Sequence, residues 1–388
     1  MSVQEEKLKA IADAIRLKKR TSELIVANDF ASEILSIETG GVTPSGTIEI
    51  TENGTYDVTE YASANVNVAS AGGGEDMLQL RVDYGENCDY LFYRYPDKPL
   101  DYISGLDTSK AKTFTYTFSY CQVKNLDLRH FNTSNVENFY WTFTGSPIEN
   151  LDVSNWNTNK VTEMYQTFQN CYNLTNLNIA NWDVSLLESL YSTFSGCSKL
   201  PILDLSTWKN VINITNLDST FASCPKLVTL NLTNWDTHNV TDWDYTFNNN
   251  TVLKEILGEL DMYSRTTTSD FLSGCKNIET LTLKNIRKTI KIGSGTSWGS
   301  KLSVDSLINT IKELWDYSSE TTTYKLTMGS TNTAKLADIY VRLITPTAEQ
   351  IEADPYIESK KPCEVCASTD EGAMLITAYA QSKNWQIS

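Results

Sequence analysis

The chain has 388 residues, more than one ordinary hydrophobic core, so we expect either several domains or an extended repeat array. Its net charge of -16 would repel a phosphate backbone, which argues against a nucleic-acid partner. No run approaches the ~18 apolar residues of a membrane span, and the charged start, Met1 to Arg20, lacks the apolar core of a signal peptide. We therefore expect a soluble protein made in the cytoplasm, with no membrane insertion.

The first 76 residues are expected to form small attachment modules. Residues 1–39 predict a helical hairpin, because apolar side chains fall on one stripe of each helix: Leu8, Ile11, Ala12 and Ile15, then Phe30, Ile34 and Ile37. Residues 46–70 alternate apolar and polar side chains on both sides of Asn53-Gly54, which predicts a small β module around that turn dipeptide. The glycines within residues 71–76 predict a flexible linker.

Residues 77–300 are expected to form an array of repeats of similar length. A phenylalanine recurs every 24 to 27 residues, at Phe118, Phe143, Phe168, Phe194, Phe221, Phe247 and Phe271. An apolar-x-apolar strand follows most of them: Leu126/Leu128, Leu151/Val153, Leu177/Ile179, Leu203/Leu205, Leu230/Leu232 and Leu281/Leu283, with an irregular stretch at 257–260. This period lies in the leucine-rich-repeat range. We expect an α/β fold in which stacked coils of a leucine-rich-repeat solenoid build one core and their strands pair into a parallel sheet.

Cysteine recurs near the same place in most units, at Cys121, Cys171, Cys197, Cys224 and Cys275, with Ser146 and Asn250 as substitutes in the other two. Cysteines at one repeated position lie stacked, so we expect small buried side chains rather than a disulfide framework. Cys363 and Cys366 form a lone CxxC, but zinc would need a second ligand pair that only two histidines do not provide. No metal and no cofactor is expected, with a redox or metal role for the CxxC as the alternative.

Residues 301–388 are expected to cap the solenoid, because the end of such an array must be sealed from solvent. A helix is predicted from Ser303, and a strand carrying Leu326 and Met328 follows it. The last segment, Met374 to Ser388, is expected to complete the seal. An inserted stretch around 338–372 is acidic and is predicted to be a loop.

The repeat unit, for example Leu151-Asp-Val-Ser-Asn-Trp156 through Val161, Met164 and Cys171, resembles the BspA-like class of leucine-rich repeats found on bacterial surfaces and phage particles. The front end, Leu8 to Ile15 and then Gly46 to Val58, looks like modules that open tail-associated proteins of phages infecting Gram-positive bacteria. The ending from Leu326 to Leu336 and at Trp385 resembles such proteins too, but this chain inserts residues that their pattern lacks.

The resemblance implies a virion component of a phage tail or baseplate, on the particle surface. Residues 1–70 would bind other tail or baseplate proteins, and the solenoid would meet a host cell-wall polymer or surface protein. Homo-oligomers in the particle, trimers or hexamers, are compatible with tail symmetry. A purely structural decoration protein of the particle and a bacterial surface adhesin are the two alternatives.

Candidate ligand-binding residues lie between the paired apolar residues of each strand, where side chains point away from the core. They form a polar ladder: Asp127, Asp152, Asn178, Asp204 and Asn231. The ladder is our candidate for binding a glycan or a cation, but the alternative that we favour is that these positions only solvate the sheet.

Tryptophans recur once per unit, at Trp156, Trp182, Trp208 and Trp235. Aromatic faces stack on sugar rings, but packing inside the coil is the alternative that we favour. His130 and His238 have no nucleophile or second histidine nearby, so we expect surface residues and no enzyme. A depolymerase would need two carboxylates about 5–9.5 Å apart in a cleft, and the sequence singles out no such pair.

Overall fold

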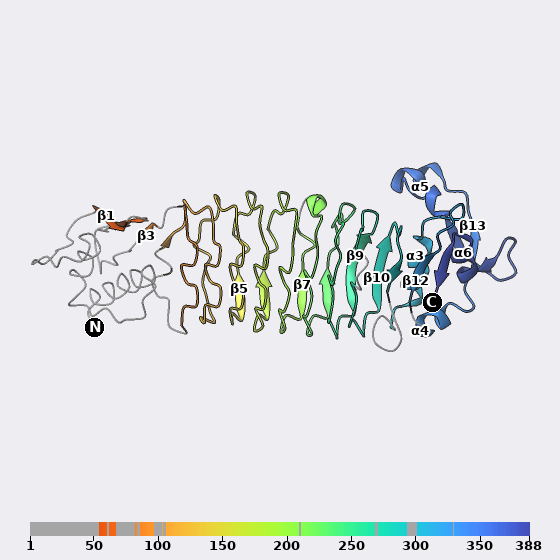
Figure 1. Cartoon of the computed structure of the whole chain (residues 1–388), viewed down its shortest axis with the longest axis horizontal. Coiled ribbons are helices and arrows are strands. Elements are labelled where there is room, and N and C mark those ends of the chain that lie inside the picture. The colour runs from red at the N-terminus through yellow and green to blue at the C-terminus, as the bar shows by residue number, and fades with distance from the viewer. Residues whose placement is uncertain are drawn as a thin grey trace, which may run out of the picture.

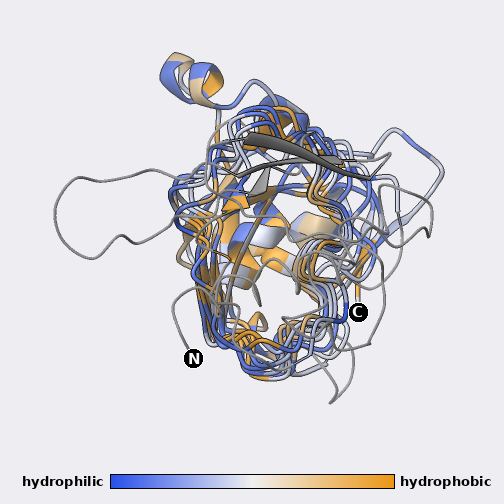
Figure 2. Ribbon diagram, turned by 90° about the vertical axis from the view of Figure 1, so that its left-hand side faces the viewer, coloured by the Kyte–Doolittle hydropathy of each residue, from blue (hydrophilic) through white to orange (hydrophobic). Residues whose placement is uncertain are grey.

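The repeats wind into coils that stack along one axis (Figure 1). The computed structural model describes residues 54–59, 62–66, 82–83, 86–96, 103, 106–208, 211–267, 271–292, 301–328 and 330–388. Seen along the axis, successive coils superimpose around a common interior (Figure 2). This arrangement is the expected leucine-rich-repeat solenoid, since every coil contributes to one continuous hydrophobic core.

One side of most coils is a short strand, and neighbouring strands pair in parallel. The coil at residues 125–128 is the exception: the strand predicted from Leu126 and Leu128 is absent, and only an isolated bridge joins Asn125 to Asn150. The strands of the array are β3 (Val82–Asp83), β4 (Leu106–Asp107), β5 (Asn150–Asp152), β6 (Asn176–Asn178), β7 (Ile202–Asp204), β8 (Thr229–Asn231), β9 (Glu255–Asp261) and β10 (Thr280–Lys284). A 3-10 helix, η3 (Val211–Asn213), follows β7. Equivalent residues pair across coils, for example Leu151 with Leu177 and Leu203 with Leu230.

The parallel sheet is not continuous, as the sequence had suggested, but divides between β6 and β7. In the other coils, the amide just before the strand donates to the preceding coil: Thr175 N to Glu149 O, and Val228 N to Pro201 O, both at 2.9 Å. Proline has no N–H, so Pro201 cannot donate the equivalent bond. The four-stranded part β10-β9-β8-β7 is therefore separate from the pair β5-β6. The pair β3-β4 is separate as well, because the coil between β4 and β5 contributes only the bridge of Asn125 to Asn150.

The opposite side of each coil is a run of tight turns around the ladder phenylalanine. Every second amide donates to the next coil, as in Tyr116 N to Tyr140 O at 3.0 Å and Phe118 N to Thr142 O at 2.8 Å. The amides between them bond three residues back, as Ser119 N does to Tyr116 O. Such turns need left-handed residues, and Tyr116 has a φ of 57°. The backbone is satisfied here without a strand.

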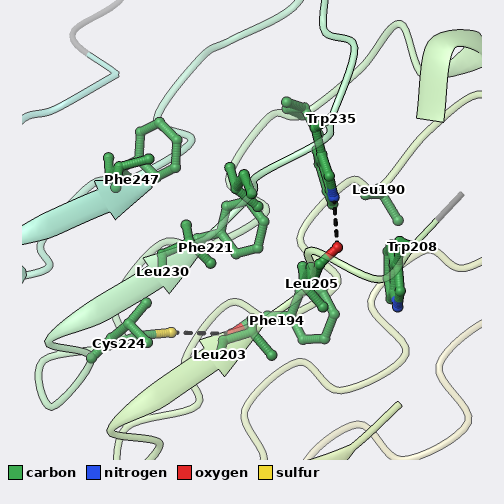
Figure 3. Close-up of a cluster of buried hydrophobic side chains, with 14 of the residues drawn as sticks. Leu190, Phe194, Leu203, Leu205, Trp208, Phe221, Cys224, Leu230, Trp235 and Phe247 are labelled. Carbon is green, nitrogen blue, oxygen red and sulfur yellow. Dashed lines mark hydrogen bonds between the residues drawn. The ribbon is translucent and has the colours of Figure 1, made fainter. Parts of the chain in front are cut away.

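Side-chain ladders fill the interior (Figure 3). Phe194 stacks between Phe168 and Phe221, with ring centroids 5.6 and 5.7 Å apart and interplanar angles of 10° and 2°. The Cys224 thiol donates to the Phe194 carbonyl of the previous coil at 3.3 Å. Burial raises the pKa of the Cys224 thiol to about 12. The repeated cysteines that the structure describes are buried free thiols, as expected.

The irregular stretch at 257–260 is a bulge in β9. Four steps of β9, Glu255 to Glu259, lie opposite two steps of β10, Thr280 to Thr282. Ile256 and Leu260 therefore both remain buried in the core. Gly258 makes the bulge at a φ of 105°, where a Cβ atom would lie 2.6 Å from the Leu232 carbonyl oxygen.

Ahead of the array, β1 (Gly54–Thr59) pairs antiparallel with β2 (Ala62–Val66). The hairpin therefore turns between these strands, after Thr59, and the turn expected at Asn53-Gly54 is displaced, because Gly54 itself pairs with Val66. The predicted helical hairpin of residues 1–39 and the linker of 71–76 lie outside the described residues.

The C-terminal region lies at the far end of the array (Figure 1). Its elements are β11 (Ile290–Lys291), α3 (Val304–Lys312), β12 (Tyr324–Thr327), α4 (Ser330–Lys335), β13 (Tyr340–Leu343), α5 (Ala348–Ala353), η4 (Glu358–Lys360), β14 (Cys363–Cys366), β15 (Met374–Leu375), α6 (Ile376–Ser382) and β16 (Trp385–Ile387). The predicted helix is α3, which Ser303 caps by accepting from the Ser306 amide. β11, β12 and β16 form a parallel sheet. The final segment thus adds a strand to the end of the array.

The stretch around 338–372 is not a loop, contrary to the sequence prediction. β13 is the centre of an antiparallel sheet with order β14-β13-β15, and Val341 on it is fully buried. Thr347 and Gln350 form a capping box at the start of α5. Lys360, buried, reaches Glu313 Oε2 at 2.6 Å and Asp354 Oδ2 at 2.5 Å. These contacts fix the stretch to the rest of the C-terminal region.

Candidate functional site

Four of the five predicted ligand-binding residues lie on the outward face of the parallel strands β5 to β8, and Asp127 lies in the coil before β5, two residues after the Asn125 bridge. Asp127, Asp152 and Asp204 are exposed, while Asn178 and Asn231 are half-buried. The pairing sets Asp152 beside Asn178 and Asp204 beside Asn231. The ladder is thus a row of polar side chains along the solenoid axis, interrupted between β6 and β7, where the sheet divides.

Most ladder residues also hold the turn that follows their strand. Asp152 Oδ1 accepts from the Ser154 amide at 3.2 Å and from its hydroxyl at 2.8 Å. Asp204 makes the same two bonds with Ser206, at 3.0 and 2.7 Å. Asn231 accepts from the Thr233 amide at 3.1 Å. These are Asx-turns, so part of the ladder's role is structural.

A shallow, open hollow of about 330 Å³ lies on this face, and we call it the polar hollow. Its lining is Asn125, Leu126, Asp127, Arg129, Asn150, Leu151, Asp152 and Asn176. Arg129 donates two hydrogen bonds to the Asp127 carboxylate, from Nε to Oδ1 at 2.9 Å and from Nη2 to Oδ2 at 2.8 Å. These bonds hold the pKa of the Asp127 carboxyl well below its usual range, so the carboxylate stays ionised. The hollow therefore offers amides, carboxylates and one guanidinium together.

The recurring tryptophans do not offer their faces to solvent. Trp156, Trp182, Trp208 and Trp235 are buried, with 1–6% of their surface exposed. Each indole N–H donates to a carbonyl of the previous coil, as Trp235 does to Leu205 O at 3.0 Å (Figure 3). The packing interpretation is confirmed for these residues, and stacking of a sugar on them is wrong.

A second set of aromatic residues, which the strand pattern of the sequence did not indicate, lies on the turn side of the coils. Tyr140, Tyr165 and Tyr191 each stand three residues before a ladder phenylalanine. Their rings contact one another across coils at 6.2 and 5.7 Å. The fixed offset from the phenylalanine was the signal that could have revealed them.

The described residues offer no cluster of the kind that binds a metal ion. They contain no group of three or more His, Cys, Asp and Glu side chains that could hold a metal ion. Cys363 and Cys366 stand three residues apart on β14, where side chains alternate between faces, so the two thiols point to opposite sides. His238 is half-buried and contacts Asp261 Oδ2 at 3.1 Å, stacked on Tyr263.

Two overlapping stretches of the chain, residues 86–208 and 188–291, match the family model described as "Mycoplasma protein of unknown function, DUF285". Together they span 86–291, which is more than half of the 388 residues. The chain belongs to this family. The DUF285 match falls on the coils described above, in keeping with a BspA-like leucine-rich-repeat protein.

Other comparisons add little to the DUF285 assignment. A leucine-rich repeat protein from Bacteroides ovatus is 13% identical, over 73% of this chain and 85% of that chain, with a TM-score of 0.27. So low a score carries no argument. No curated protein matches the chain. Within the described part of the DUF285 chain, no helix is long and apolar enough to cross a membrane.

Proposed function

We propose that this DUF285 chain is a structural protein of a phage tail or baseplate, and that its coils bind the surface of the host cell. The observation that carries the proposal is the polar hollow on the outward strand face. Asp127, Arg129 and Asp152 stand there with three asparagines, so hydrogen-bond donors and acceptors converge on one open surface. Such groups bind the hydroxyls and amides of a wall polymer or a surface protein.

The proposed role is binding rather than catalysis. A shallow hollow that is open to water does not exclude solvent from a reacting bond, as an active site does. Residues 1–70 are proposed to mount the chain on other tail or baseplate proteins, in line with the resemblance of that segment to phage tail modules.

Binding of the full-length chain to intact Gram-positive cells tests the proposal. The variant has Asp127, Asp152, Asn178 and Asp204 changed to Ala, and saturable binding of the wild type should be lost in it. A matched control changes Asp152 and Asp204 to Asn, because asparagine keeps the Asx-turns and removes only the charges. Circular dichroism of each variant checks that the coils remain folded.

Binding retained by the alanine variant would move the contact away from the polar ladder, including Asp127 and Asp152, which line the polar hollow. If the folded wild type binds no cells, the decoration role is favoured instead. Deletion of residues 77–388 tests the mounting role, since the remaining front end should still be found on purified particles.

A further inference from the structure

The turn side of the first coils carries a continuous row of aromatic rings, which we call the aromatic strip: Tyr116, Tyr140, Trp141, Tyr165 and Tyr191. Tyr116 contacts Trp141 at 4.9 Å, Trp141 contacts Tyr140 at 5.7 Å, and Tyr140 contacts Tyr165 at 6.2 Å. The strip therefore runs along the solenoid axis, with rings in each of four successive coils. It lies about half a coil further along the chain than the polar hollow.

The strip is part of the surface and not of the core. All five side chains are half-buried, whereas the ladder phenylalanines beside them are fully buried. Tyr90, stacked on Tyr116 at 4.8 Å, and Tyr120 extend the aromatic surface, and they are 41% and 39% exposed. Monomeric proteins rarely leave a large contiguous apolar patch facing water unless something binds it.

The polar atoms of the strip are unused by the protein. Within the described residues, the phenol hydroxyls of Tyr116, Tyr140, Tyr165 and Tyr191 make no hydrogen bond. The indole N–H of Trp141 is buried and also lacks a partner there. The Trp141 N–H is a cost to the fold, because a buried unpaired donor is destabilising, while the tyrosine hydroxyls face the surface and are free to bond to a ligand. Their common placement suits a ligand with many hydroxyl groups.

The polar residues near the strip indicate that its ligand is not an anion. Asn138 and Glu163 lie beside it at equivalent positions of successive coils, joined by a parallel bridge. The strip then ends, because Asp218 and Asp244 take the place of Tyr191 in the next two coils. Carboxylates beside and beyond the rings, on a chain of net charge -16, repel an anionic polymer.

We propose that the aromatic strip binds a linear, uncharged glycan that lies along the solenoid axis. The apolar faces of the sugar rings would rest on the tyrosines and Trp141, and their hydroxyls would bond to Asn138 and Glu163. Coils in parallel strand register lie about 4.8 Å apart, so a polymer of repeating sugars meets a ring in each coil that it crosses. This inference does not depend on whether the chain is a phage component.

Titration of the full-length protein with linear N-acetylglucosamine oligomers, and separately with the anionic poly(glycerol phosphate), tests the strip. The double variant Tyr140→Ala and Tyr165→Ala should bind the neutral oligomers roughly tenfold more weakly, or worse, because two stacking faces are lost. The double Phe variant at the same positions keeps the faces, and should stay within a few-fold of wild type. Tyr172→Ala removes an exposed tyrosine outside the strip and should change nothing.

The quadruple alanine variant of the polar ladder should bind these oligomers as the wild type does. Loss of binding to cells and loss of binding to the strip are therefore separate results. No binding of the neutral oligomers by the folded wild type would overturn the inference. Equal binding by the double alanine variant, or a preference for the phosphate polymer, would overturn it as well.

Discussion

Replacement of Phe194 by alanine tests whether the stacked phenylalanines hold the array together. Phe194 is fully buried in the middle of the ladder. Its ring lies parallel to Phe168 on one side and Phe221 on the other, and it also touches Trp208 at 6.2 Å. Alanine therefore removes contacts with both adjacent coils at once.

The expected cost follows from those contacts. Truncation of a buried phenylalanine lowers the free energy of unfolding by about 3–5 kcal/mol, through lost transfer energy and the cavity that remains. Contacts between aromatic pairs are worth ~0.5–1.5 kcal/mol beyond buried area, and Phe194 loses more than one, so we expect the upper part of that range. Backbone bonds on both sides of the coil limit its collapse into the cavity.

Urea denaturation of the full chain, followed by tryptophan fluorescence and circular dichroism, measures this loss. In a repeat array, stability is the sum of the coils and their interfaces, so a central defect should also separate unfolding of the two halves and broaden the transition. Tyr172→Ala, which removes a side chain 46% exposed, is the control and should stay within about 0.5 kcal/mol. A loss below about 1 kcal/mol for Phe194→Ala would refute the ladder as the source of stability.

Further predictions concern the thiols, the bulge and the C-terminal region. Burial raises the pKa of Cys171, Cys224 and Cys275 to about 12, so at pH 8 only about one such thiol in ten thousand is ionised. Because the thiolate is the form that reacts, alkylation of the folded chain should modify the partly exposed Cys366 first. Because the folded state keeps these protons while the unfolded thiols lose them near pH 8.5, the free energy of unfolding should fall as pH rises from about 8.5 towards 12, and a flat profile in urea titrations would contradict this sign. Gly258→Ala forces a Cβ against the Leu232 carbonyl at a positive φ, and should lower the free energy of unfolding by more than the about 1–3 kcal/mol of backbone strain alone. Gly372→Ala shares the positive φ but meets nothing within 4 Å, so it should show the smaller loss that strain alone causes, and equal losses would contradict the clash at Gly258. Lys360→Met leaves Glu313 and Asp354 without their cation. Trypsin or chymotrypsin should then cleave within residues 338–372 earlier than within the coils. Unchanged cleavage would show that the ion pairs do not hold this stretch.

The sequence was sufficient to predict the solenoid, because the same buried residues recur at the same offset in successive repeats. Phe194 and Trp208 recur at one offset, and a residue that returns in every coil must meet its own copies above and below. The burial of the tryptophans followed from the same reasoning. The polar ladder also falls on the outward face, since side chains alternate along a strand.

Other features depended on single residues that break the repeat. Pro201 removes one amide and divides the sheet, and the apolar-x-apolar pattern around it gave no sign of this. The stretch around 338–372 looked like a loop because it is acidic, although the Thr347 to Gln350 capping box was readable as a helix start.

The candidate site was only half visible in the sequence. Asp127 and Asp152 could be placed on the strand face, but their hollow depends on Arg129 folding back onto Asp127. The aromatic strip was missed because Tyr140 and Tyr165 stand outside the strand pattern on which the search for ligands was based.

The alternating amides of the turn side have a mechanical consequence. Tyr116 and Phe118 of one coil both bond to carbonyls of the next, and these bonds point along the axis. A pull along the axis therefore loads all bonds between two coils at the same time, so that neighbouring coils resist as a unit and yield one after another. Force spectroscopy would record a rod that is stiff up to a threshold and then lengthens in steps of one coil.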